Sequence, residues 1–414
     1  MGRIKLNKST RQVVLLYIST LVGTLLGVVA SIINTRFMEP AVYGDVRYVQ
    51  NILQFASSLL LFGYFLSGSR LLALSDSEQQ SRKIRGCMVL ILAITAVVMV
   101  AITAGCALVH YDKPQIAHLF VVSLPVCAYP ILFNYINTTA QGDNHIGRLS
   151  AARLLPVLFY IPLAYWIYSD YGATASRMIL LQWGLYTLVL LVLTISTKPL
   201  FRDVKQIFGQ LKVENRDYGF QLYIGSLVMV ATNYLAGISL GIFNENNAEV
   251  GFYTLALTVT TPLTMLPSII GTTYFKQFAR LDRIPSRVMR NTALLTIGSC
   301  LVYILIIKQL VVLLYTEQYA SVGVYASWLA VGFSVHGFGD MLNRYLGSHG
   351  QGRDIRNASI ANGVVKIVGY TLFVYLWSTT GAIVTTILCD FIYTAMIVWY
   401  YIKFVKEKGE QQSV

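Results

Sequence analysis

Residues 198–217 read KPLFRDVKQIFGQLKVENRD, a basic stretch that separates two long apolar halves of the chain. Short glycine motifs recur on either side of it. Three pairs of glycines lie at nearly the same offset, of 207, 208 and 209 residues: Gly44 and Gly251, Gly142 and Gly350, Gly172 and Gly381. A nearly constant offset predicts a duplication about residues 198–217. Weak internal repeats of this sort are typical of transporter folds.

The composition predicts an all-α polytopic membrane protein. Hydrophobic residues make up 55% of the 414 residues and charged residues only 12%, whereas soluble domains carry about 25% charged residues. The apolar residues form long runs, and about 20 of them in succession cross a hydrocarbon core. The first run, 13–33, is longer than the roughly 7–15 apolar residues of a signal peptide, so we expect it to remain as the first helix.

Turn residues and charge clusters divide the chain into twelve predicted transmembrane helices. The first six are 12–34, 44–68, 86–109, 115–137, 149–168 and 173–197, and the other six are 218–243, 250–275, 291–314, 321–346, 358–378 and 380–403. An even number per half predicts two parallel six-helix repeats. The predicted parts are an N-terminal lobe at 1–197, a cytoplasmic connection at 198–217, a C-terminal lobe at 218–404 and a cytoplasmic tail at 405–414.

Lysine and arginine are distributed unevenly between the loops. Of the 32, 26 lie at the N-terminus, in the tail and in alternate loops, including two in the loop that begins at Arg148. Because cytoplasmic loops carry the excess of basic residues, both termini are predicted to be cytoplasmic. Topology thus accounts for the net charge of +13 without a nucleic-acid partner. Asp143, in the hinge before Arg148, is expected to be a solvated loop residue.

Neither enzymatic nor cofactor chemistry is expected. The chain has no glycine-rich phosphate-binding loop of the GxxxxGK type, which argues against an ATP-driven pump. A polysaccharide polymerase is disfavoured because the outer loops are only several residues long. The five cysteines are scattered without CxxC or Cys/His spacing, so we expect neither disulfides nor a metal site.

Polar stripes follow several spans. The residues of the second-span stripe share one helical face, at i, i+4, i+7 and i+11: Arg47, Asn51, Gln54 and Ser58. The eighth span repeats the stripe with three threonines: Thr254, Thr258 and Thr261. In lipid such faces must contact protein or a water-filled cavity, and we favour the cavity over interhelical hydrogen bonding. A milder stripe follows the first span, where close helix packing is an equal explanation: Thr20, Thr24, Gly27 and Ser31.

Lys366 lies about eight residues into the eleventh span. A lysine at that depth is unfavourable by roughly 2.5–3.5 kcal/mol or more unless it is paired or hydrated, so it marks a functional site by default. The alternative is a structural ion pair with Asp340 or Asp390. His336, one turn before Asp340, completes a set of candidate ion-coupling residues; a satisfied structural histidine is the alternative.

The remaining candidates are arginines at the outer ends of spans. Arg36 ends the first helix and Arg177 lies in the sixth span; anchoring at the membrane interface is the alternative for both. Together with Arg47 and Lys366 they predict a positive, membrane-embedded cleft. Such a cleft suits an anionic substrate that carries phosphate or pyrophosphate.

Three short motifs carry a resemblance to a known family. They are MEPAVYG at residues 38–44, GFY at residues 251–253 and the loop 68–76, which contains Arg70. With the twelve predicted spans in two halves, the chain resembles the bacterial polysaccharide repeat-unit flippases, the O-antigen or Wzx-type translocases of the MATE-like MOP superfamily. The resemblance implies two lobes around a central cationic cavity.

The resemblance also implies a function. An undecaprenyl-pyrophosphate-linked oligosaccharide would cross the bacterial inner membrane by alternating access, driven by an ion gradient or the membrane potential. Arg47 and Lys366 would hold the pyrophosphate, and the polar residues of the second and eighth spans would contact the head group or sugars. The implied partners are membrane lipids, a polysaccharide polymerase and chain-length proteins. Thr254 stands where the repeat places Arg47, so this site would be lopsided.

A proton- or sodium-coupled exporter of small organic solutes is the alternative function. It would use His336, Asp340 or Asp390 as its coupling site. Drug-exporting relatives often carry an acidic residue in the first helix, and residues 13–33 contain none, which favours the flippase.

Overall fold

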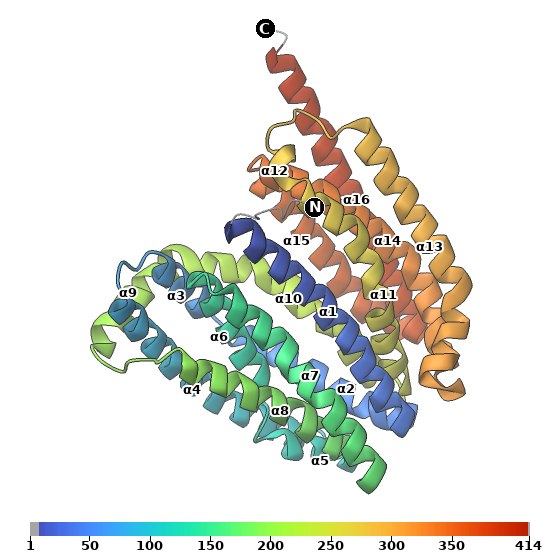
Figure 1. The fold of residues 1–414 in the computed structure, drawn as a ribbon. Coiled ribbons are helices and arrows are strands. Elements are labelled where there is room, and N and C mark those ends of the chain that lie inside the picture. The colour runs from blue at the N-terminus through green and yellow to red at the C-terminus, as the bar shows by residue number, and fades with distance from the viewer. Residues whose placement is uncertain (1–7, 413–414) are drawn as a thin grey trace, which may run out of the picture. The chain divides into compact units, whose positions relative to one another are not determined.

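The computed structural model describes residues 8–412, apart from the side chains of 8–17, 225, 226, 228–231, 276, 409, 411 and 412, and nearly all of this part is helical (Figure 1). Within it, seven helices are long and apolar enough to cross a membrane, or eight if one bent pair forms a single span. The prediction of an all-α membrane protein is confirmed. The count of twelve spans stays a prediction.

The described chain divides into two compact units. The first contains the residues up to Met38 together with Val49–Ala231, and the second contains Glu39–Tyr48 and the residues from Thr232 onward. Two helices, α2 (Pro40–Leu59) and α10 (Phe220–Phe243), therefore contribute to both units. A short segment from the beginning of the chain thus belongs with the second half.

The first unit is built from helices in the order of the chain. They are α1 (Lys8–Phe37), α3 (Tyr64–Ala73), α4 (Glu78–Val109), α5 (Pro114–Ser123), α6 (Tyr129–Gly142), α7 (Ile146–Tyr171), α8 (Ala175–Ser196) and α9 (Val204–Glu214), followed by the π-helical turn Asn215–Gly219. α1 lies along α7, and α3 packs on α6 (Figure 1).

The predicted second span is two helices, because the chain breaks between α2 and α3 with a bend of 61°. Phe62 and Gly63 there have φ angles of 43° and 80°, which an α-helix does not accommodate. A Cβ at Gly63 would overlap the carbonyl of Gly219, so this turn needs glycine for close approach as well as for its conformation. The predicted fourth span is likewise divided, into α5 and α6.

The connection is fastened to the first unit. Lys83 Nζ lies 2.6 Å from Asp203 Oδ2, and this ammonium holds the pKa of Asp203 below its ordinary value. Arg70 Nη1 donates to Glu214 Oε1 at 2.7 Å, and Ser67 Oγ donates to Asn215 Oδ1 at 3.0 Å. Residues 203–215 therefore belong structurally with α3 and α4.

The second unit centres on α14 (Ala320–Ser348), which packs on α11 (Ala248–Thr273), α13 (Ser286–Tyr315) and α16 (Val374–Gln412). Its other elements are α12 (Phe275–Phe278), the 3-10 turn Glu317–Tyr319, α15 (Gly352–Val368) and the π-helical turn Gly369–Phe373. α16 contains a break at Ser378, whose φ is 49°. This break separates the segments predicted as the last two spans.

Two glycines that mark the predicted repeat, Gly44 and Gly251, meet in the second unit. A Cβ at Gly44 would overlap the carbonyl of Asn247, and a Cβ at Gly251 would lie 3.1 Å from the carbonyl of Pro40. Asn247 Nδ2 also donates to Asp45 Oδ1 at 2.7 Å. Glycine is needed at position 44 because the backbones approach too closely for a side chain, whereas at position 251 a Cβ would be tight.

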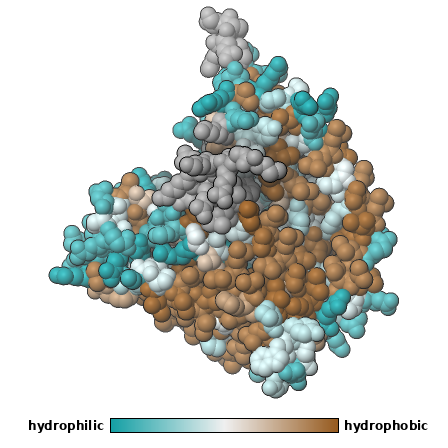
Figure 2. Space-filling model, in the orientation of Figure 1, coloured by the Kyte–Doolittle hydropathy of each residue, from teal (hydrophilic) through white to brown (hydrophobic). Residues whose placement is uncertain are grey.

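The outer faces of the helices are apolar. Figure 2 shows hydrophobic side chains covering much of the viewed surface. On α13, Leu301, Leu305 and Leu313 are 59%, 73% and 71% exposed. A helix that exposes leucine along its length requires an apolar solvent, as a membrane provides.

Candidate functional site

A cavity of about 340 Å³ lies inside the second unit. Titratable residues from three helices line it: His336 and Asp340 on α14, Lys366 on α15 and Asp390 on α16. The structure thus brings together all three predicted ion-coupling residues and the predicted mid-membrane lysine. The rest of the lining is mostly polar, with two apolar residues, Leu257 and Phe333: Asn233, Tyr253, Thr261, Thr264, Tyr370 and Thr386 are the polar ones.

His336 lies between the two carboxyl groups. Its Nδ1 is 3.0 Å from Asp390 Oδ1, and its Nε2 is 3.9 Å from Asp340 Oδ1. The Asp390 side chain is 9% exposed, against 29% for each of the other two. A proton taken up by this imidazole would therefore lie near the negative charge of two carboxyl groups.

Tyr393 fixes the position of this histidine. Its ring stacks on the His336 ring at a centroid distance of 4.6 Å, and its hydroxyl donates to Asp340 Oδ1 at 3.2 Å. Asn343 Nδ2 in turn donates to the Tyr393 hydroxyl at 2.7 Å. These contacts orient the imidazole and one carboxyl group as a unit. Tyr393 and Asn343 were missed in the sequence, where an aromatic residue in a span is indistinguishable from ordinary packing.

Lys366 points to a neutral partner. Its Nζ donates to Asn233 Oδ1 at 3.0 Å, and among the described residues it has no carboxylate oxygen within 4.0 Å. The alternative of a close ion pair with Asp340 or Asp390 is therefore not what the structure contains. The ammonium keeps donors available to the cavity. The cavity itself combines one lysine with two acids and a histidine, so within the second unit it is not uniformly positive.

The threonine stripe of the eighth span falls on α11. Thr261 lines the cavity, whereas the hydroxyl of Thr258 donates to the carbonyl of Thr254 at 2.8 Å. The Thr261 hydroxyl donates within its own helix too, to the carbonyl of Leu257 at 2.8 Å. These hydroxyls are thus satisfied locally, and a role in binding substrate stays a prediction.

The stripe of the second span falls on α2, at the point where that helix passes from one unit to the other. Arg47 belongs to the second unit, and its Nε donates to the Tyr43 hydroxyl at 2.7 Å. Asn51 and Gln54 belong to the first unit; both are half-buried, and Gln54 Nε2 donates to the carbonyl of Gln50 at 3.2 Å. Their predicted roles in binding substrate stay predictions.

Arg36 and Arg177 are both exposed. Arg36 lies in the last turn of α1, where a cation interacts favourably with the terminal carbonyl groups. Arg177 Nη1 donates to the carbonyls of Tyr171 and Gly172, the latter at 2.9 Å, and so fastens the turn between α7 and α8. This is the position expected of an anchoring residue, and a cavity role for Arg177 stays a prediction.

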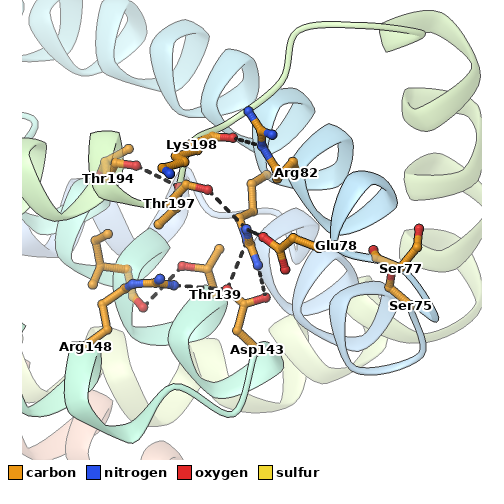
Figure 3. Close-up of polar contacts among 12 residues, drawn as sticks. Ser75, Ser77, Glu78, Arg82, Thr139, Asp143, Arg148, Thr194, Thr197 and Lys198 are labelled. Atoms are coloured by element: carbon orange, nitrogen blue, oxygen red, sulfur yellow. Dashed lines mark hydrogen bonds and ion pairs between the residues drawn. The ribbon is translucent and has the colours of Figure 1, made fainter.

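A second charged cluster lies at one end of the first unit. The guanidinium of Arg85, on α4, donates to both carboxylate oxygens of Asp143 at 3.0 and 2.9 Å and to the carbonyl of Thr197 at 3.1 Å. Glu78 and Arg148 complete the cluster, at 2.8 Å from Arg85 and 3.1 Å from Asp143. Figure 3 shows Glu78, Asp143 and Thr197 converging from three different segments.

The expectation of a solvated Asp143 is therefore wrong. Its side chain is only 4% exposed and that of Arg85 only 5%. A hinge with glycine, aspartate and asparagine predicts a turn but not its burial, because the partner that buries it lies 58 residues away in the chain. The cluster joins α4 to the ends of α6 and α8.

The position of Arg153 was missed because the count of basic residues by loop assigned it to a loop. Arg153, one of the two basic residues assigned to the loop at Arg148, is the eighth residue of α7. It lines a separate cavity of about 460 Å³ inside the first unit, together with Thr20 and Thr24 of the first-span stripe. A count of basic residues by loop cannot detect this, since it assigns every residue near a helix end to the loop.

Comparisons with known proteins were made by sequence and by structure. A family model described as "Polysaccharide biosynthesis protein" matches residues 9–281. A search of the curated proteins finds no match.

Several solved structures have a similar fold. "Lipid II flippase MurJ, inward closed conformation" has a TM-score of 0.75 at 12% identity, covering 95% of this chain and 89% of that one. An inward-facing multidrug resistance MATE family transporter of the MOP superfamily has a TM-score of 0.69 at 15% identity, covering 96% and 99%. The MATE multidrug transporter DinF-BH has a TM-score of 0.65 at 12% identity, covering 97% of each chain.

Proposed function

Because the chain belongs to the polysaccharide biosynthesis protein family, we propose that it is a flippase for undecaprenyl-pyrophosphate-linked oligosaccharide repeat units. The family match over residues 9–281 is the observation that carries the proposal. The likeness to a lipid II flippase supports it at the level of the fold. Transport would proceed by alternating access across a bacterial inner membrane, with an ion gradient or the membrane potential as the driving force.

The proposed architecture follows the predicted repeats. Two lobes of six spans, at 1–197 and 218–404, enclose a central cavity, and the connection at 198–217 and both termini are cytoplasmic. The distribution of basic residues between the loops supports this orientation. No soluble catalytic domain is needed, because flipping breaks no covalent bond.

We assign the cavity of the second unit to ion coupling and head-group binding. Protonation of His336 would add one positive charge between Asp340 and Asp390 and so change how strongly the cavity attracts an anion. Lys366 and Arg47 would contact the pyrophosphate, while Thr261 would contact a polar group of the substrate. Supporting this, Lys366 lines the cavity with no carboxylate in direct contact.

The mixed charge of the cavity also favours a second candidate, a proton-coupled exporter of small organic solutes. The two functions differ in what they require of Lys366. Lys366→Glu should abolish the transport of an anionic lipid-linked substrate, whereas an exporter of organic cations retains activity. Lys308→Glu, at an exposed lysine on α13, is the matched control.

The test of the flippase uses cells that make the cognate repeat unit and lack this protein. Lipid-linked oligosaccharide should accumulate in the cytoplasmic leaflet, and wild-type protein should relieve the accumulation. Lys366→Ala should fail to relieve it at a normal membrane level, and Lys308→Ala should succeed. Normal surface polysaccharide in the deletion strain would refute the proposal.

A further inference from the structure

The cavity of about 460 Å³ in the first unit lies among α1, α6, α7 and α8. Its volume falls within the roughly 300–1,000 Å³ of small-molecule sites. Arg153 is the one charged residue among its lining, which is otherwise formed by threonine, serine, aromatic and aliphatic side chains. Tyr129, Phe133 and Tyr186 supply the aromatic wall.

Arg153 has neutral partners only. Its Nη1 donates to Thr20 Oγ1 at 2.8 Å and its Nη2 donates to Asn137 Oδ1 at 3.2 Å. Among the described residues no carboxylate lies within 4.0 Å of it, in contrast to Arg85 and Arg148 of the same unit, which share Asp143. A guanidinium has five N–H donors, so it can still bind an anion.

Its depth makes this lack of a counter-ion significant. Arg153 lies seven residues beyond the start of α7, or about 10 Å along the helix at about 1.5 Å per residue. Arg153 is half-buried there, and an arginine within a membrane helix marks a functional site by default, because its charge is unfavourable in hydrocarbon without a partner. A low-polarity wall strengthens its attraction for an anion that enters.

A glycine of α1 and a proline of α7 also line this cavity. A Cβ at Gly23 of α1 would make only ordinary contacts with α7, at 3.7 Å from Leu154 Cδ2 and 4.0 Å from the Arg153 carbonyl. Pro156 of α7 lines the cavity and lacks an N–H, so it leaves the carbonyl of Ala152 without its helical partner. This proline is a specific feature of the sequence at the wall of the cavity.

We infer that this cavity is a second anion site, which binds the diphosphate group of the lipid-linked substrate through Arg153. The inference rests on the proposed function and adds to it a site in the first unit. Arginine suits the ligand because its planar fork matches phosphate oxygens in pairs, which lysine does not. The other source of the same chemistry is the head group of an anionic phospholipid.

The test uses a photoreactive prenyl diphosphate and the purified full-length protein in detergent. Peptide mass spectrometry locates the label. Wild-type protein should be labelled in peptides of α1 or α7, and Arg153→Gln should lower that labelling at least about tenfold. Arg216→Gln, at an exposed arginine of the connection, should leave it unchanged. Equal labelling of α1 and α7 in wild type and Arg153→Gln would overturn the inference.

Competition identifies the source of the anion. Unlabelled geranylgeranyl diphosphate should displace the label, whereas geranylgeraniol, which has no charge, should not. Displacement by phosphatidylglycerol at the same concentration would assign the cavity to a phospholipid and overturn the assignment to substrate. If Arg153→Gln is not monodisperse, the test uses Arg153→Lys, which keeps the charge. Labelling of Arg153→Lys should fall several-fold, and labelling equal to that of wild type overturns the inference.

The leaflet assay separates this inference from the proposed function. If the deletion strain makes normal surface polysaccharide, the proposed function fails. If wild-type protein restores flipping and Arg153→Gln restores it equally well, the proposed function stands and the anion site fails.

Discussion

Arg85→Met should destabilise the first unit through Asp143. The substitution keeps an unbranched apolar stem and removes the guanidinium with its charge. It leaves a carboxylate that is 4% exposed without two of its hydrogen bonds, with only Arg148 as a charged partner at 3.1 Å. Removing one member of a buried ion pair is unfavourable by about 3–5 kcal/mol, and the remaining arginine favours the lower figure.

The expected shift in melting temperature follows from that free energy. For about 150–250 residues, 1 kcal/mol corresponds to about 2–4 °C, so about 3 kcal/mol predicts a fall of about 6–12 °C. Glu78→Gln is the control: that carboxylate is 72% exposed, so its pair with Arg85 contributes about 0–1 kcal/mol. Arg85→Met combined with Asp143→Leu should recover part of the loss, because neither buried charge then remains.

The measurement is the fraction of monodisperse protein after heating in detergent, by fluorescence-detected size-exclusion chromatography. Two results would refute the reasoning. One is an Arg85→Met midpoint within about 2 °C of wild type, because a shift that small corresponds to a loss of less than about 1 kcal/mol. The other is a loss in Glu78→Gln as large as that in Arg85→Met.

Three further predictions concern the second unit and the glycines. Gly44→Ala should remove monodisperse protein because its Cβ overlaps a carbonyl, whereas Gly27→Ala, with open space around it, should be neutral; equal yields would contradict this. Gly332→Ala places a methyl group 2.9 Å from Asp390 Oδ2. The pH dependence of transport should therefore change, while the protein level falls by less than half. An unaltered pH profile contradicts the coupling role. Arg47→Ala should lose transport at an unchanged membrane level, and a parallel loss of protein, seen by immunoblot, would favour a structural role.

The apolar runs were sufficient to predict most of the helices. α4, α7, α8, α11, α13 and α14 fall on predicted spans, since length and hydropathy are local properties of the sequence. The break at Phe62 and Gly63 was not predictable in this way. A lone glycine in an apolar run is a weak signal, and what fixes this one is the carbonyl of Gly219, far along the chain.

In the candidate site, too, some residues were predictable from the sequence and others were not. His336, Asp340, Lys366 and Asp390 stand out because charge is rare in a membrane span, and the structure brings all four to one cavity. Their partners do not stand out, because asparagine, threonine and tyrosine are ordinary residues in such helices. Periodicity assigns a residue to a face of its own helix, but it says nothing about which helix lies opposite. Asn233 and the first-unit cavity of Arg153 were missed for that reason.

The segment Glu39–Tyr48 has a consequence for how the protein is made. It belongs to the second unit, yet it is synthesised before the whole of residues 49–231. At about 5–20 residues per second, the 184 positions from Tyr48 to Thr232 take the ribosome roughly 10–40 s. Throughout that interval Gly44 and Asp45 lack Asn247, the residue they pack against. If the chain were expressed as two fragments divided at residues 198–217, Asn247 would lie on the second fragment and its partners Gly44 and Asp45 on the first. The second fragment should therefore require the first in order to complete its own packing.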